Sequence, residues 1–146
     1  MSSETQRFED AVGLFDLAIS FSTDGEALAH CFADFVEFHG LTCYHYSRHL
    51  LRQSGLQIDA IMRFVYLQIN PVVVLNTPEY GQSRSTRFEI EILENAPAAK
   101  SICIVELGGA PLKFQSHNLQ RYSNLDSDIA FALVEIARRG AGLSEG

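Results

Sequence analysis

The stretch Arg87-Phe-Glu-Ile-Glu-Ile-Leu93 has the most regular strand pattern in the sequence. Its Phe and Ile residues alternate with Glu89 and Glu91, and this alternation is typical of a strand with one buried and one solvated face. Strands of this kind occur in antiparallel sheets that helices cover on one side. The stretch therefore predicts an antiparallel sheet, with Glu89 and Glu91 on its solvated face.

Other segments with strand character surround this stretch. They are Leu41–Tyr46, Val72–Leu75, Ser101–Leu107 and Leu112–Gln115. The last two are joined by Gly108-Gly109, and two glycines suit the positive φ angles of a hairpin turn. Residues 56–69 fit both a strand and a helix, and Asn70-Pro71 ends them because proline constrains the residue before it.

Three helices are expected, two at the start of the chain and one at its end. Residues 5–21 carry apolar side chains at intervals of three and four, as a helix requires. A second helix follows a Thr23–Glu26 capping box and ends at Gly40. The last runs from its cap, Asp126, to Arg139, with acids at its start and bases at its end. This order predicts an α+β fold, an antiparallel sheet of about five strands with the two N-terminal helices and the C-terminal helix packed on it.

The chain has an ordinary globular composition. It has 146 residues, of which 47% are hydrophobic and 20% charged. We expect a single domain over residues 1–146, with an ordered core at about 5–140 and a flexible tail at 141–146. An apolar signal core and a membrane span are both lacking in the sequence, so we expect a cytoplasmic protein.

The acidic charge is concentrated in the first quarter of the chain. The formal net charge is −7, and residues 1–40 hold eight acids and one base. Nucleic acids and anionic membranes are recognised by clustered Lys and Arg, so neither is an expected partner. The acidic N-terminal helices would suit a basic protein partner.

No motif in the sequence identifies a reaction. It contains no GxSxG elbow, no HExxH and no phosphate loop, so we expect a protein that is not an enzyme. Its cofactor is left open, since the sequence itself requires none. Cys31, Cys43 and Cys103 lack CxxC spacing and have apolar neighbours, which predicts reduced, buried thiols. His45 and His49 are weak metal or haem candidates, because on a strand they would lie about 13 Å apart.

Tyrosines indicate a small-molecule site. Tyr44 and Tyr46 share one face of a predicted strand, and Tyr66 lies shortly before Asn70. With Phe88 they would form an apolar pocket that contains a few polar groups, the usual design of a ligand site. The alternative is that these tyrosines pack in the core with their hydroxyls at its edge.

The order of elements also resembles a known family. The segments Phe38-His-Gly40, Leu41–Tyr46 and Ile69-Asn-Pro-Val-Val73 are similar in layout to the autoinducer-binding domain of LuxR-type regulators, which belongs to the GAF/PAS-like sensory modules. In that family an Asp before Pro-Val holds the ligand amide, and here that place is Asn70. The family's Trp and Tyr fall near Gln57 and Ile61, which do not match.

The resemblance implies a sensory pocket between sheet and helices, and a helix-mediated homodimer. The first hypothesis is therefore a non-enzymatic sensory or regulatory module that binds a small apolar ligand. Its pocket would be formed by Tyr44, Tyr46, Tyr66, Asn70 and Phe88. The alternative is an acidic interaction module, such as a chaperone, immunity or inhibitor protein, that binds a basic partner through its N-terminal helices.

Overall fold

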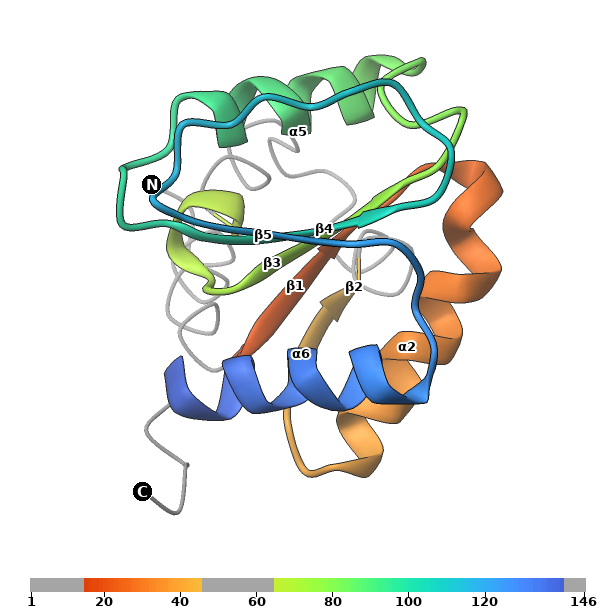
Figure 1. Ribbon diagram of the computed structural model, residues 1–146, viewed down its shortest axis with the longest axis vertical. Helices are drawn as coiled ribbons and strands as arrows, with labels where there is room; N and C mark the ends of the chain where they lie inside the picture. The colour runs from red at the N-terminus through yellow and green to blue at the C-terminus, as the bar shows by residue number, and fades with distance from the viewer. Residues whose placement is uncertain (1–14, 46–64, 141–146) are drawn as a thin grey trace, which may run out of the picture.

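The computed structural model describes residues 15–45 and 65–140 of the chain (Figure 1). Its elements are β1 (Leu17–Ser20), the 3₁₀ turn η1 (Thr23–Gly25), α2 (Glu26–Phe38), β2 (Cys43–His45), β3 (Val72–Asn76), α5 (Arg84–Glu94), β4 (Ser101–Glu106), β5 (Asn118–Tyr122) and α6 (Ser127–Gly140). Within the described residues, no helix is both long enough and apolar enough to cross a membrane.

The five strands form one sheet in the order β2-β1-β3-β4-β5, and every neighbouring pair is parallel. The predicted antiparallel sheet is therefore wrong. The central strands β1 and β3 are buried at every position, without the alternation of a half-solvated strand. Continuous apolar runs such as Val72–Leu75 are typical of parallel strands, because helices cover both of their faces.

The stretch Arg87–Leu93 lies in a helix, α5, so its prediction as a strand is also wrong. The Ser83 side chain accepts a hydrogen bond from the Thr86 backbone N–H at 3.2 Å, which caps the first turn. Thr86, Glu89 and Leu93 are buried at helical spacing. Seven alternating residues are too few to distinguish a strand from a helix, and the cap together with this buried stripe decides for the helix.

Two further predictions, a helix over residues 5–21 and a hairpin at Gly108-Gly109, are also wrong. Leu17–Ser20, expected at the end of a first helix, is the buried strand β1, and residues 5–14 of that helix lie outside the described chain. The hairpin at Gly108-Gly109 does not form, because β4 and β5 are parallel and are joined by the longer connection 107–117. Leu112–Gln115, predicted as the second strand of this hairpin, lies in that connection and is not a strand. Of the two glycines, Gly108 does have a positive φ, +95°.

Other boundaries are confirmed. Strands β2, β3 and β4 lie where Leu41–Tyr46, Val72–Leu75 and Ser101–Leu107 predicted strands. Gly40 has a φ of +82° just after α2, and Asp126 caps α6 by accepting the Ile129 N–H at 2.9 Å. The Thr23–Glu26 capping box does not form, since Gly25 is the N-cap of α2 and offers no side-chain bond.

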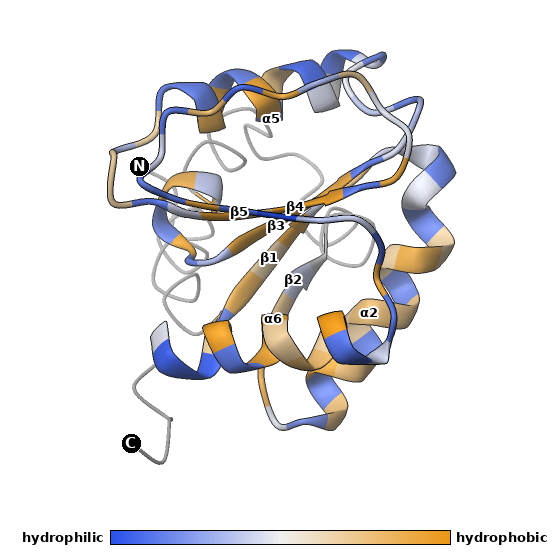
Figure 2. Ribbon diagram, viewed as in Figure 1, coloured by the Kyte–Doolittle hydropathy of each residue, from blue (hydrophilic) through white to orange (hydrophobic). Residues whose placement is uncertain are grey.

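Helices cover both faces of the sheet (Figure 1). On the face of α5, one core cluster contains Val72, Val74, Ile102 and Ile104. On the other face, α2 and α6 pack over a second cluster that includes Val73 and the other strand residues facing that side. The strands at the centre are mostly hydrophobic and the helices are two-sided (Figure 2), as a three-layer α/β arrangement requires.

Candidate functional site

The topology marks one end of the sheet as the candidate site. Strands β1 and β3 are neighbours, but α2 follows β1 on one face and α5 follows β3 on the other. The order 2-1-3-4-5 is the flavodoxin-like form of a doubly wound sheet, and such sheets bind ligands at the carboxyl ends of the strands where the connections diverge. In this chain that switch point lies just beyond Ser20 and Asn76.

A buried glutamate from α5 lies at this switch point. Glu89 is 3% exposed, and its Oε1 accepts a hydrogen bond from Ser20 Oγ at 2.7 Å. Ser20 Oγ is also 2.6 Å from the hydroxyl of Tyr80. Because the single Ser20 hydroxyl proton goes to Glu89, Tyr80 is the donor in the second bond. The three side chains therefore form a hydrogen-bonded chain, which we call the Glu89 cluster.

Burial perturbs the protonation of this cluster. It raises the pKa of Glu89 from 4.5 to about 7, although the hydrogen bond from Ser20 opposes the change. Burial, followed by the charge of Glu89, raises the pKa of Tyr80 and of Tyr66 well above the usual value. A carboxyl group that titrates near neutral pH can both give and take a proton, which is the property of a general acid or base.

A second carboxylate, Asp24, lies in η1, just after β1 at the same end of the sheet. It accepts hydrogen bonds from Ser22 Oγ at 2.6 Å, from Thr77 Oγ1 at 2.5 Å and from the Glu79 N–H at 3.0 Å. Partial burial raises its pKa, but these hydrogen bonds outweigh that effect and leave the pKa below its usual value. Asp24 therefore stays ionised under conditions in which Glu89 is partly protonated.

Next to these groups, Asn76 holds the connection between β4 and β5 against the end of β3. Its Nδ2 donates to Glu106 Oε1 at 2.7 Å and to the Ala110 carbonyl at 2.9 Å. Its backbone carbonyl accepts the N–H of Gly109 at 3.0 Å. A Cβ on Gly109 would overlap the Asn76 side chain, so only glycine allows this approach.

Two of the predicted ligand-binding tyrosines are brought together beside the Glu89 cluster. Tyr44 and Tyr66 are both fully buried, and their rings meet edge to face at 6.3 Å. The Tyr66 hydroxyl donates to the Ile19 carbonyl at 3.2 Å. The two tyrosines therefore belong to the core on the α5 side of the sheet, with Tyr66 at the edge of the polar cluster.

Of the other residues predicted for the pocket, the structure places only Asn70 away from this pair, and Phe88 packs against the same core cluster. Asn70 lies at the opposite end of the sheet, where its Oδ1 accepts the Ser101 N–H at 3.0 Å. Phe88 is half-buried on α5 and packs against the core next to Glu89. Tyr46 and His49 lie outside the described residues, as does the side chain of His45.

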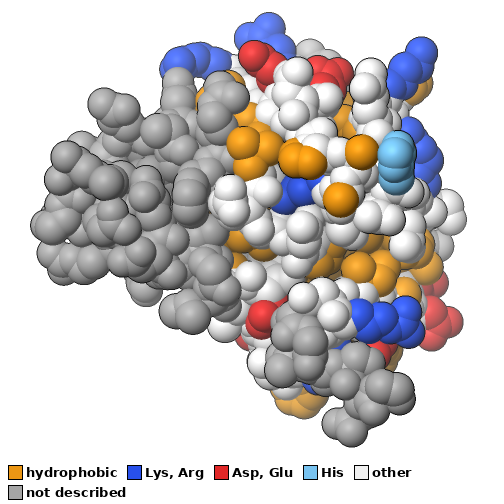
Figure 3. Space-filling view, turned by 90° about the vertical axis from the view of Figure 1, so that its left-hand side faces the viewer, with side chains coloured by type: hydrophobic (Ala, Val, Ile, Leu, Met, Phe, Trp, Pro, Cys, Tyr) orange, Lys and Arg blue, Asp and Glu red, His pale blue; other side chains and the backbone are white. Residues whose placement is uncertain are grey.

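The described residues offer no metal site, and their cysteines do not form a reactive thiol site. The described parts of the chain hold no cluster of three His, Cys, Asp or Glu side chains that suits a metal ion. Cys43 and Cys103 are buried as predicted, and burial raises the pKa of Cys103 to about 12. Cys31 is exposed, so its predicted burial is wrong. On the described part of the face drawn in Figure 3, Lys and Arg side chains stand apart and form no continuous patch.

Sequence reasoning missed Glu89, because it placed this residue on the solvated face of a strand. A usable signal was present in the sequence. Ser83 followed by Thr86 is a helix start, and a helix from there places Glu89 on one stripe with Thr86 and Leu93. An acid on the apolar stripe of a helix is unusual, because a buried carboxyl group requires a polar partner.

Comparisons with protein-family models, with curated proteins and with solved structures found no match for this chain. The resemblance to LuxR-type autoinducer-binding domains is neither supported nor refuted by them.

Proposed function

We propose that the protein is a small-molecule-binding sensory or regulatory module whose ligand contacts the Glu89 cluster. The observation that carries this proposal is a buried glutamate, hydrogen-bonded to Ser20, at the switch point of a doubly wound sheet. A buried carboxyl group lowers stability unless something compensates for it, and such groups are concentrated at functional sites. The proposed site is thus centred on Glu89 rather than on Asn70.

A nucleotide-type ligand fits this end of the sheet best. Doubly wound sheets commonly bind nucleotides there, and a carboxylate accepts hydrogen bonds from ribose hydroxyls. Helix α5 begins at this end, and its first turns carry the exposed Arg84 and Arg87. Their charge, together with the positive end of the helix, would favour the phosphates of the ligand. A cytoplasmic location, where free nucleotides occur, is part of the proposal.

A second candidate function is hydrolysis of the bound ligand. Glu89 and Asp24 have pKa values shifted in opposite directions, and such a pair divides the roles of proton donor and ionised carboxylate. Two carboxyl groups with divided roles are the usual machinery for cleaving glycosidic bonds. In this version Glu89 would donate a proton to the leaving group as its bond to the sugar breaks, Asp24 would stabilise the positive charge that develops on the sugar, and water would add to the sugar carbon and lose a proton.

Thermal-shift measurements with AMP, ATP, FMN and NAD⁺ test the binding proposal. An acyl-homoserine lactone serves as the competing ligand class. We expect at least one nucleotide to raise the melting temperature of the wild type and of Glu91→Gln, an exposed control on the same helix. The same nucleotide should have little effect on Glu89→Gln. A shift with the lactone alone, or an equal nucleotide shift in Glu89→Gln, would contradict the proposal.

Chromatography of the same mixtures separates binding from hydrolysis. If the protein is an enzyme, a free base and a ribosyl product accumulate with the wild type but not with Glu89→Gln or Asp24→Asn. If a nucleotide binds and remains intact, the protein is a binding module and the hydrolytic candidate is rejected.

A further inference from the structure

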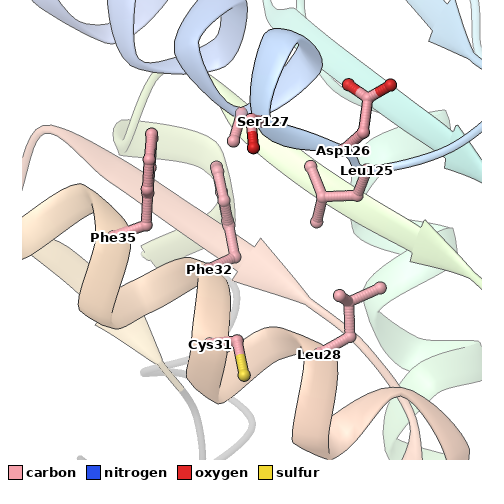
Figure 4. A pocket seen from close by; sticks show the side chains of 8 residues that line it. Leu28, Cys31, Phe32, Phe35, Leu125, Asp126 and Ser127 are labelled. Atoms are coloured by element: carbon pink, nitrogen blue, oxygen red, sulfur yellow. The ribbon is translucent and has the colours of Figure 1, made fainter.

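The face of the sheet opposite α5 carries a groove between α2 and α6, which we call the α2–α6 groove. It has a volume of about 170 Å³ and is lined by Leu28, Cys31, Phe32, Phe35, Leu125, Asp126, Ser127 and Ala130. The side chains of Leu28 and Phe32 point toward Leu125 across it (Figure 4). The floor is therefore apolar, while Asp126 and Ser127 bring polar groups to the rim.

Exposed aromatic rings continue the apolar surface beyond the groove. Phe38 is 86% exposed and Phe131 is 49% exposed, the two large hydrophobic side chains that stand out among the described residues. The Phe131 ring meets Phe35 at 5.1 Å and His39 at 5.0 Å. A contiguous apolar patch with a polar rim is characteristic of a protein-binding surface.

The charge around this surface is acidic. Asp34 on α2, and Asp126 and Asp128 at the start of α6, are exposed. Neither the segment 26–38 nor the segment 123–137 contains a Lys or Arg. At the far end of α6, Arg138 lies close to Glu135 at 3.6 Å and donates to the His39 carbonyl at 2.7 Å. The groove thus combines an apolar floor with a surplus of carboxylates.

We infer that the α2–α6 groove binds a basic amphipathic helix of a partner protein. The apolar side chains of that helix would fill the groove and cover Phe131, and its Lys and Arg side chains would lie over Asp34, Asp126 and Asp128. Recognition of a helix by a groove uses apolar anchors at helical spacing, and complementary charge adds speed and specificity. A second copy of this chain is the poorer occupant, because a two-fold contact would place the same acidic rim against itself.

A synthetic amphipathic peptide with Leu on one face and Lys on the other is the direct probe. Its binding is followed by fluorescence anisotropy at low and at high salt, beside a peptide of the same design with Glu in place of Lys. We expect the Lys peptide to bind the wild type, to bind more weakly at high salt, and to bind Asp34→Lys/Asp128→Lys about tenfold more weakly. Glu91→Lys/Glu94→Lys, which makes the same charge change on α5, should bind the peptide like the wild type.

The exposed Cys31 reports directly on occupancy of the groove, because Cys43 and Cys103 are buried. Saturating Lys peptide should slow alkylation of Cys31 by iodoacetamide in the wild type. Phe131→Ser, which changes no charge, should weaken both the binding and this protection.

Three results would overturn the inference. They are equal binding of the Lys and Glu peptides, an alkylation rate that the Lys peptide leaves unchanged, and an equal loss of binding in the α5 control. Protection of Cys31 that rises with protein concentration in the absence of peptide would also overturn it, because a second copy would then cover the groove.

Discussion

Among the described residues, Glu89 and Lys100 are buried at opposite ends of the sheet, and they differ in how their side chains are held. At the carboxyl end, Glu89 is bonded to a chain of hydroxyl groups from Ser20 and Tyr80. At the amino end, Lys100 is 2% exposed and donates from Nζ to the Ile69 carbonyl. Burial raises the pKa of Glu89 to about 7 and lowers that of Lys100 to about 7.

Under the proposed function, the difference separates the group that contacts the ligand from the group that supports the fold. Each side chain is shifted toward its uncharged form, because a buried charge without a counter-charge is unfavourable. Glu89 lies at the switch point, where ligands bind in doubly wound sheets, and neighbouring hydroxyls can exchange protons with it. Lys100 lies at the opposite end and ties the start of β4 to the segment before β3, which is a structural role.

Replacing Glu89 with Gln should change the free energy of unfolding the most, because it removes the titrating group at the carboxyl end of the sheet. Between pH 4.5 and about 7 the unfolded chain releases a proton that folded Glu89 retains, so the stability of the wild type falls through this range. The variant lacks this fall. It should be more stable than the wild type at pH 8 by up to roughly 3 kcal/mol, measured by urea unfolding at pH 5 and pH 8. Glu91→Gln is the control, and an equal gain there would contradict the assignment.

Replacing Lys100 with Met tests the amino end, where the pH dependence has the opposite sign. Between pH 7 and 10.5 the unfolded chain keeps a proton that folded Lys100 has lost, so the stability of the wild type rises through this range. The variant should lose this rise. At pH 7 its free energy of unfolding should be about 2 kcal/mol higher than that of the wild type, a net value that includes the lost hydrogen bond to Ile69.

The exposed Lys113→Met is the matched control for this measurement. If the Lys100 variant also lost its ligand-induced thermal shift, the two ends would not differ in function as proposed.

Replacing Ser20 with Ala breaks the hydroxyl chain at its centre. Glu89 and Tyr80 would each lose a hydrogen bond in the core, at a cost of about 1 to 2 kcal/mol in the free energy of unfolding. Because the Ser20 bond lowers the pKa of Glu89, the pKa should rise above about 7 in the variant. Carbon-13 NMR of labelled glutamate through a pH titration measures this, with the exposed Ser123→Ala as the control. An unchanged titration would mean that Ser20 does not hold the carboxylate.

Tyr80→Phe should reduce the stability the least, because it removes only the hydrogen bond from Tyr80 to Ser20 and leaves the bond from Ser20 to Glu89 intact. Glu89 keeps its bond from Ser20, so the expected loss of stability is about 0.5 to 1 kcal/mol. The pKa of Glu89 should move less than in Ser20→Ala. If Tyr80→Phe changed the pKa of Glu89 more than Ser20→Ala does, Tyr80 rather than Ser20 would be the direct partner of Glu89.

The sequence predicted helix α6 with its Asp126 cap, the end of α2 at Gly40, and strands at β2 and β3. These depend on local chemistry, namely a capping side chain, a glycine with positive φ and a β-branched apolar run. It misplaced β1 and α5, since four residues at Leu17–Ser20 and seven at Arg87–Leu93 are too short for their periodicity to be decisive. Of the candidate site, it found Tyr44 and Tyr66 but not Glu89.

The amino-acid sequence encodes the supply of apolar segments, the helix ends and the concentration of acid before residue 41. The parallel direction of the strands comes from tertiary packing, because it depends on where each connection crosses the sheet and not on the strand residues themselves. Tertiary packing also buries Glu89, which the sequence pattern predicted to be solvated. The end of β1 brings Ser20 within 2.7 Å of a residue far along the chain, and no local pattern encodes that contact.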